Sequence, residues 1–494
     1  MARILLLNPN RWGRGITTTW IASHTATLKA KGHEVALFDA AFYKDWAQNE
    51  TAFNTANQQY RPSSYEEMIT MNDTPVVTAL QKKINEFQPD VVFWSAISAH
   101  IHGEGEYAAI QFGSELMKDV NFSGITVCSG LQATAAPLET AQRFADVDYF
   151  ISGESDFVIV EFLDALDASA PVENIPGLVY RSGTEVIIGS KQSIIPHLDA
   201  IGPYDYSLFD EQVFLRPYNG DVVRAVDYEM SRGCPFTCSY CVETVIQRYY
   251  NFESSTPRGA LNDAKSYIRH KSAKRIFEEL SDLHKNYGIS LFRCQDTNFL
   301  TIDRKTLNDL ADLLEESDLD IRLYIETRPE GITPKSVILL KRLKVDGVGM
   351  GIELATQEFR ESSLNRFSNQ EKIIAAFKQL RAAGIKRSAY NIIGLPDQTE
   401  ESIIETIEFN QEIDPDNVTV AFFSPYIGTE QQRSSAGKDY FLDYEFDLDS
   451  QLRTMSRNSL ISTSSLAFYK KNFVRLVREG IDSLDSLKSA DGVN

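Results

Sequence analysis

The sequence predicts an α/β protein with two parallel sheets: an amino-terminal doubly wound sheet and a partial (β/α)6 barrel, followed by an irregular and helical carboxyl-terminal cap. Two series of short aliphatic runs alternate with stretches of helical periodicity, which is the pattern of parallel sheets covered by helices. A stretch richer in Pro and Gly separates the two series. The 494 residues also exceed the size of one hydrophobic core, which is about 250 to 300 residues.

The first series occupies residues 1–165. A helix from about Trp20 to Lys31, ended by Gly32, separates its first two strands, and a polar insertion at residues 44–74 precedes the third. The expected strands are "RILLLNPN", "HEVALFDA", "DVVFWSAIS", "GITVCSG" and "DYFISG". A doubly wound sheet of about five strands binds ligands beyond the carboxyl ends of its strands.

The second series occupies residues 223–427, after a connecting segment at 166–222 with short strand signals in "GLVYR" and "EVIIG". Its expected strands are "AVDYEMS", "SLFRCQD", "RLYIET", "GVGMGIE", "SAYNIIG" and "VTVAFFSPY". Six such units favour a partial barrel over a closed one with eight units, and its chemistry should lie at the carboxyl ends of the strands. Residues 428–494 are expected to cap the barrel.

Composition excludes several classes of partner. The formal charge is -20, from 49 Lys and Arg against 69 Asp and Glu, so we expect no nucleic-acid partner. No run approaches 18 apolar residues, so we expect no membrane span, and the apolar run in "MARILLLNPN" is too short for a signal peptide. Five cysteines, three of them clustered, argue against a disulfide framework and favour a cytoplasmic location.

The clustered cysteines lie in "SRGCPFTCSYC", residues 231–241, directly after the first expected barrel strand. Cys234, Cys238 and Cys241 have the spacing C-x3-C-x2-C. A structural zinc site normally takes four N or S ligands, often as two separated pairs, and the remaining Cys128 and Cys294 have no paired partner nearby in sequence. Three thiolates on one loop favour a [4Fe-4S] cluster with one open iron, with zinc as the alternative.

The spacing Cys-x3-Cys-x-aromatic-Cys after a barrel strand resembles the motif of radical S-adenosylmethionine (SAM) enzymes. In that family SAM chelates the open iron, and an electron from the cluster splits SAM to give a 5'-deoxyadenosyl radical. The resemblance implies that Cys234, Cys238 and Cys241 hold the cluster and that Tyr240 packs beside the cofactor.

Further segments at the ends of the strands resemble SAM-binding segments of the same family. They are "FRCQDTNF", "YIETR", "GMGIELAT" and "NIIGLPDQT", and "FFSPYIGT" matches the sixth strand end loosely. The alternative for the charged members is an ordinary ion pair at the barrel mouth, and for the glycines a turn. The resemblance implies SAM contacts at Asp296, Glu326, Arg328, Glu353, Ile392 and Gly394, with Asn298 beside them.

In the first domain, "VCSGLQATAAPLETAQRFADVDYFISGESD" resembles a stretch of the Rossmann-like cobalamin-binding domains of radical SAM enzymes. Gln132 stands where the family has a histidine. None of the seven histidines lies two residues after an Asp, which implies a cobalt without a histidine below it. His100 and His102 follow a strand end and are candidates near the corrin or ordinary surface residues. The resemblance implies cobalamin contacts at Asn10, Ser95, Ser98, Ser129, Gly130, Gly153 and Glu154.

Together the resemblances imply a cobalamin-dependent radical SAM enzyme, foremost a methyltransferase at an unactivated carbon, or phosphorus, of a small metabolite or natural-product intermediate. The cofactors would be a [4Fe-4S] cluster, SAM and cobalamin. The partners would be a small-molecule substrate and an external electron donor of the flavodoxin or ferredoxin type. One alternative is a non-methylating radical reaction, such as cyclisation, ring contraction or methylthiolation. Another is a non-catalytic sensor that binds an iron-sulfur cluster or a corrinoid.

Overall fold

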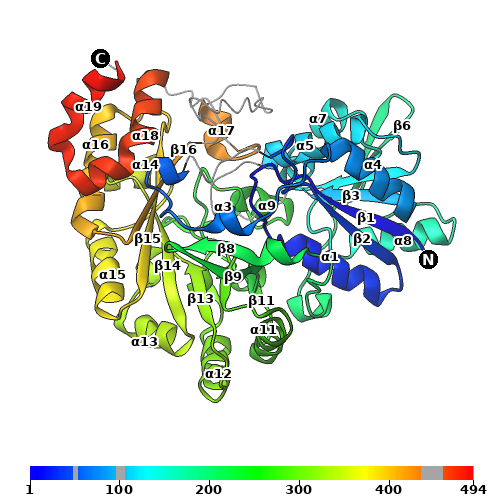
Figure 1. Cartoon of the computed structure of the whole chain (residues 1–494), viewed down its shortest axis with the longest axis horizontal. Coiled ribbons are helices and arrows are strands. Elements are labelled where there is room, and N and C mark those ends of the chain that lie inside the picture. Colours follow the sequence, from blue (N-terminus) through cyan, green and yellow to red (C-terminus); the bar gives the residue numbers. More distant parts are fainter. Residues whose placement is uncertain (48–53, 96–105, 424–425, 436–459, 493–494) are drawn as a thin grey trace.

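Two seven-stranded sheets form the framework of the protein. In Figure 1 the first sheet lies at the upper right, in blue and cyan, and the second lies at the centre and lower left, in green to orange. No helix within the described part of the chain is long and apolar enough to cross a membrane. The computed structural model describes residues 1–47, 54–95, 106–423, 426–435 and 460–492.

The first sheet has the strand order β2-β1-β3-β4-β5-β6-β7. The five parallel strands are β1 (Arg3–Asn8), β2 (Glu34–Asp39), β3 (Val91–Ser95), β4 (Ile125–Ser129) and β5 (Tyr149–Ile151), as predicted. The segment at 166–222 adds the antiparallel strands β6 (Leu178–Ser182) and β7 (Glu185–Ile188). The strand order reverses between β1 and β3, which is where doubly wound sheets form ligand crevices.

Both faces of this sheet are buried, which explains its continuous aliphatic runs. On β1, Ile4 and Leu6 belong to the same apolar cluster as α1 and α8, while Leu5 and Leu7 pack with α4 and α5. The helices of this domain are α1 (Thr19–Ala30), α3 (Tyr65–Met68), α4 (Val76–Phe87), α5 (Glu106–Lys118), α6 (Leu131–Ala135), α7 (Pro137–Arg143) and α8 (Val158–Asp167).

The second sheet has the order β16-β15-β14-β13-β12-β9-β8, with six parallel strands and the antiparallel β8 at one edge. β16 and β8 are the two edges, so this is the predicted partial barrel. Its strands are β8 (Leu215–Tyr218), β9 (Asp221–Tyr228), β12 (Leu291–Cys294), β13 (Arg322–Glu326), β14 (Val345–Glu353), β15 (Lys386–Ile393) and β16 (Asn417–Phe422). The short strands β10 (Ser231–Arg232) and β11 (Arg269–His270) pair with each other.

Helices cover the outside of the barrel, and glycines leave room inside it. The helices of this half of the chain are α9 (Glu243–Tyr249), which packs against α6, and α10 (Ala264–Tyr267), α11 (Ala273–Tyr287), α12 (Arg304–Glu315), α13 (Pro334–Arg342), α14 (Gln357–Ser362), α15 (Gln370–Ala382) and α16 (Glu400–Ile413). A Cβ atom on Gly347 would lie 2.7 Å from the Tyr324 ring, and one on Gly349 would meet the Tyr390 hydroxyl. The alternating glycines of "GVGMG" therefore admit tyrosines from both neighbouring strands.

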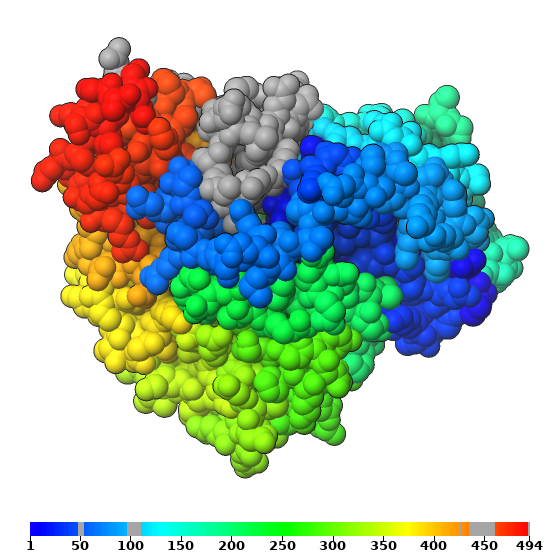
Figure 2. All heavy atoms as spheres, viewed as in Figure 1, coloured from blue at the N-terminus to red at the C-terminus, as the bar shows by residue number. Residues whose placement is uncertain are grey.

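The polar insertion and the carboxyl-terminal segment complete the barrel. Gln59 accepts a hydrogen bond from the Val420 backbone N–H at 3.1 Å, so the insertion reaches the edge strand β16, as the blue band across the centre of Figure 2 shows. The segment at 426–435, which includes α17 (Glu430–Ser435), contacts the cysteine loop through Gln431, whose N–H donates to Ser239 O at 3.1 Å. The remaining helices, α18 (Thr463–Glu479) and α19 (Leu484–Asp491), pack beside α16 and β16.

Candidate active site

Residues that follow strands of the first sheet and residues that follow β9 and β12 of the second line a common cavity of about 180 Å3. Both sheets contribute to its lining. The first contributes Gly130, Gly153, Glu154 and Asp156, and the second contributes Ser231, Arg232, Gly233, Gln295 and Thr297. The cavity therefore lies between the predicted cobalamin side of the first sheet and the residues that directly precede Cys234.

The cysteine loop follows β9 and β10 and is held in place by its backbone. Gly233 has φ +97°, and a Cβ there would lie 2.7 Å from Tyr267 O, so this turn requires glycine. The Cys234 N–H donates to Glu243 Oε1 at 3.1 Å, and Gln247 Nε2 donates to Cys234 O at 2.8 Å. These contacts fix the first cysteine before any ligand binds.

The chemistry of the three thiols fits an iron-sulfur cluster. All are free, Cys234 and Cys238 are buried, and Cys241 is half-buried. Burial raises the pKa of the Cys234 thiol to about 12, so the thiolate needs a strong positive charge beside it. Arg328 supplies part of that charge, since its Nη1 lies 3.7 Å from Cys238 Sγ. Three thiolates fit a [4Fe-4S] cluster with one open iron.

The arrangement of the thiols differs from that of a site for a single metal ion. Among the described residues, no group of three His, Cys, Asp or Glu side chains is arranged to hold one metal ion. A cluster that carries an iron at each cysteine does not require the three thiols to converge on one point.

Several predicted SAM residues gather beside this loop. The Tyr240 hydroxyl donates to Glu353 Oε1 at 2.8 Å, and Arg366 Nη1 lies 3.6 Å from the same oxygen. Arg328 forms an ion pair with Glu330 at 2.9 Å. Tyr240 also packs against an apolar cluster that contains Ile392, Leu354, Leu364, Leu395 and Phe423. An apolar wall beside paired charges suits an adenosine with a charged amino-acid tail.

The other predicted SAM residues make different contacts. Asp296 Oδ1 accepts hydrogen bonds from the Met230 N–H and from Ser231 Oγ, and burial raises the pKa of this carboxyl to about 7. Glu326 accepts from the Tyr390 hydroxyl at 3.2 Å, and burial raises its pKa to about 7 as well. Asn298 accepts from Thr327, and the Gly394 N–H donates to Gln398.

The predicted cobalamin residues of the first sheet form a row of hydroxyl groups beside two glycines. Ser129 Oγ donates to Ser95 Oγ at 2.9 Å and lies 3.3 Å from Ser155 Oγ. Gly130 has φ +137° and Gly153 has φ +83°, and a Cβ on Gly153 would lie 2.7 Å from the Tyr249 ring and 2.7 Å from the Tyr250 hydroxyl. These backbones therefore border the cavity without side chains.

Not every predicted residue of this sheet reaches the cavity. The Asn10 side chain binds within its own loop, where Nδ2 donates to Arg14 O at 2.8 Å. Ser98, His100 and His102 lie outside the described residues. Gln132 is buried.

Two buried polar atoms beside the cavity support a ligand there. Thr18 Oγ1 and His24 Nδ1 are buried and have no hydrogen-bond partner among the described residues, and both residues line the cavity. Burial lowers the pKa of His24 to about 4, so the ring is neutral, and its Nε2 lies 3.0 Å from Ser155 Oγ. Buried polar atoms normally have a hydrogen-bond partner. These two atoms, together with the row of hydroxyl groups and the two glycines, therefore fit the polar part of a cofactor such as cobalamin.

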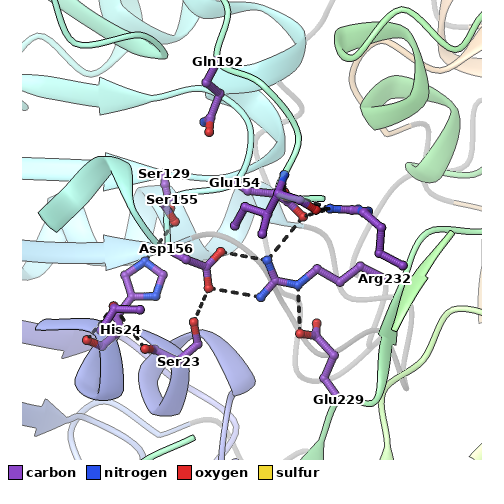
Figure 3. A network of polar contacts seen from close by, with 12 residues as sticks. Ser23, His24, Ser129, Glu154, Ser155, Asp156, Gln192, Glu229 and Arg232 are labelled. Atoms are coloured by element: carbon purple, nitrogen blue, oxygen red, sulfur yellow. Dashed lines mark hydrogen bonds and ion pairs between the residues drawn. The ribbon is translucent and has the colours of Figure 1, made fainter. Parts of the chain in front are cut away.

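A buried ion network joins the two sheets beside the cavity (Figure 3). Arg232 points between carboxylates of both domains: its Nη1 lies 2.8 Å from Asp156 and 3.3 Å from Glu154, and its Nε lies 2.8 Å from Glu229. Arg269 also pairs with Glu154, at 2.7 Å. The sequence placed Glu154 at cobalamin, but the structure gives its carboxylate two arginine partners.

A second group of buried polar contacts links the two domains at Asp227 on β9. Thr17, at the start of the first helix, donates its N–H and its hydroxyl to Asp227 Oδ2, each at 3.1 Å. Arg216 lies 2.9 Å from the same oxygen, and Gln295 donates to Oδ1 at 3.0 Å. Sequence reasoning missed Arg232, Arg366 and Asp227, although Arg232 lies two residues before the first clustered cysteine.

The cysteine loop and the barrel strands lie in a segment that matches a known family. The model of the radical SAM superfamily matches residues 228–409, and this part of the chain is a radical SAM domain. The prediction of a radical SAM domain in this part of the chain is therefore confirmed.

Curated relatives extend the similarity beyond this domain. The chain is 27% identical over 350 residues to an uncharacterized methyltransferase of Pyrococcus horikoshii, which covers 71% of this chain and 70% of that protein. It is 23% identical over 456 residues to an anaerobic magnesium-protoporphyrin IX monomethyl ester cyclase of Rubrivivax gelatinosus, which covers 90% of this chain and 72% of that protein.

Solved structures share the fold of both domains. The radical SAM methyltransferase TsrM from Kitasatospora setae, with cobalamin and a [4Fe-4S] cluster bound, matches at a TM-score of 0.64 and 15% identity, over 88% of this chain and 78% of that one. The cobalamin-dependent SAM radical enzyme OxsB, with aqua-cobalamin bound, matches at 0.65 and 14%, over 96% and 67%. The two-domain fold is that of cobalamin-dependent radical SAM enzymes.

Proposed function

We propose that the protein is a cobalamin-dependent radical SAM methyltransferase that acts on an unactivated carbon, or phosphorus, of a small molecule. The observation that carries this proposal is the shared cavity, because residues that follow strands of both sheets line it. The methyltransferase relative of Pyrococcus horikoshii and the fold shared with TsrM support it.

The cofactors would supply the chemistry: a radical from SAM at the cluster, and a methyl group from cobalamin. Cys234, Cys238 and Cys241 would hold the cluster, with Arg328 offsetting thiolate charge. Tyr240 and the ion pair of Glu353 with Arg366 would orient SAM. The hydroxyl row and the glycines of the first sheet would bind cobalamin.

The ion network around Arg232 would fix the distance between the two cofactor sites. A radical reaction between two cofactors depends on how closely their reacting atoms are held. Arg232 ties Asp156 of the first domain to the β-strand that precedes the cluster loop, and Thr17 ties the start of α1 to Asp227. The side chains of this protein would therefore position the two cofactor sites as one unit.

Product analysis of anaerobic turnover tests the proposal. A methyltransferase forms S-adenosylhomocysteine together with 5'-deoxyadenosine and a methylated product, when SAM, a reductant and a panel of small molecules are supplied. Deoxyadenosine without S-adenosylhomocysteine during turnover would instead indicate a non-methylating reaction. Cyclisation is the second candidate, because similarity to the Rubrivivax cyclase extends over 90% of this chain.

We further propose an external electron donor of the flavodoxin or ferredoxin type and a reducing, cytoplasmic location. An iron-sulfur cluster with an open iron needs both an electron source and protection from oxidants. All five cysteines are free, which supports such a compartment.

A further inference from the structure

The inside of the partial barrel is open near the strand ends. Side chains alternate along a strand, and the outward members of β12, β15 and β16 are buried under helices. Toward the carboxyl ends, the alternate members Arg293, Tyr390, Ile392, Thr419 and Ala421 are partly exposed, and so are Gln295 after β12 and Glu326 on β13. These side chains on the inner face of the partial barrel are therefore partly accessible.

Arg293 is the unusual member of this set. It lies on the same face of β12 as Leu291, which packs on Tyr324 inside the barrel, while Phe292 and Cys294 pack in the outer core. Its guanidinium has no hydrogen bond or ion pair with any described residue. By contrast, Arg328 pairs with Glu330, and Arg366 contacts Glu353.

The carboxylates near Arg293 are already engaged. Asp227 is bound by Thr17, Arg216 and Gln295. Burial raises the pKa of Glu326 to about 7, although the nearby charge of Arg293 opposes this rise, and Glu326 accepts a hydrogen bond from Tyr390. The charge of Arg293 therefore acts on both carboxylates without a hydrogen bond to either, and an anion that completes its hydrogen bonds would stabilise the half-buried guanidinium.

We propose that Arg293 binds an anionic group of the substrate, a carboxylate or a phosphate, inside the barrel lumen. The inference rests on the proposed function, because it places the substrate between the SAM side of the barrel and the interdomain cavity. Arginine matches both anions, since its planar fork donates two parallel hydrogen bonds. Glu326 and Tyr390 would then meet a polar group elsewhere on the same substrate.

Arginine labelling on the intact, anaerobically reconstituted protein tests this proposal. Phenylglyoxal modifies accessible guanidinium groups, and mass spectrometry of peptides gives the rate at Arg293. We expect acetate or phosphate, at about four times its dissociation constant, to slow this rate about fivefold. Chloride at the same ionic strength should not. Arg322, which stacks on Tyr218 at the other end of the barrel, is the internal control and should keep its rate.

Each outcome of the labelling has a defined meaning. Protection by acetate alone identifies a carboxylate, and protection by phosphate alone identifies a phosphate. An Arg293 that resists labelling, or that neither anion protects, or that chloride protects equally, overturns the proposal.

A variant separates this inference from the proposed function. Arg293→Gln should keep the iron content, SAM binding and cobalt content of the parent protein but lose the rise in melting temperature that the protecting anion causes. If the parent retains no cobalt while Arg293 is still protected, the methyltransferase proposal fails and the anion site stands. If Arg293→Gln keeps the full anion-dependent rise, the anion site fails instead.

Discussion

Arg232→Met should destabilise the protein strongly, because it leaves three carboxylates of both domains without their shared cation. Removing one partner of a buried ion pair costs about 3 to 5 kcal/mol. Burial alone would disfavour the charged form of Asp156, but Arg232 holds the pKa of that carboxyl well below its usual range. With an unfolding entropy of about 2.1 cal/mol/K per residue over 494 residues, the melting temperature should fall by about 3 to 5 °C.

Calorimetry of the cofactor-free protein at neutral pH measures this change. The control is Arg475→Met, which removes the exposed pair with Glu479 on α18 and should move the melting temperature by less than about 1 °C. The double variant Arg232→Met with Asp156→Asn should recover part of the loss, since it removes one stranded charge. A single Arg232→Met variant that melts like its parent would refute the reasoning.

Three further variants test the site. Cys234→Ala should abolish most of the iron content after reconstitution, whereas Cys294→Ala, a buried thiol outside the loop, should leave it unchanged; equal iron in both refutes the ligand assignment. Glu353→Gln should weaken SAM binding about tenfold by calorimetric titration, because it removes the charge between Tyr240 and Arg366 and costs about 1.4 kcal/mol; unchanged affinity argues against this site.

Asp296 gives the third test, which concerns pH. Its folded pKa of about 7 exceeds the unfolded value of about 4, so the folded state holds the proton longer and the free energy of unfolding falls as the pH rises from about 4 to about 7. Asp296→Asn should remove this slope in chemical denaturation, and an unchanged slope would show that another group causes it.

The sequence predicted most parallel strands because a strand buried on both faces, or on all but a few positions, has an almost continuous apolar run. "RILLLN" became β1 and "GVGMGIE" became most of β14. The strands at residues 178–188 have a weaker apolar pattern, because an antiparallel edge hairpin buries fewer of its side chains. Sequence analysis therefore assigned them to a connecting segment.

The site was predictable where a motif is local and not where it depends on folding. Cys234, Cys238 and Cys241 share one loop, so their spacing alone indicates a cluster. Arg232 and Asp156 are 76 residues apart and meet only when the two domains pack. The sequence correctly places Asp296 after the expected strand. The structure shows that its carboxyl accepts a hydrogen bond from the Ser231 side chain, and a pattern of residue types does not predict such a side-chain orientation.

Metal analysis of the anaerobically purified protein, produced with added cobalamin and with iron and sulfide, tests the central claim most directly. The account predicts about four irons and about one cobalt per chain, with loss of iron but not of cobalt in Cys234→Ala. Four irons without any cobalt, under the same conditions of supply, would contradict the claim that this chain unites a radical SAM cluster with a corrinoid.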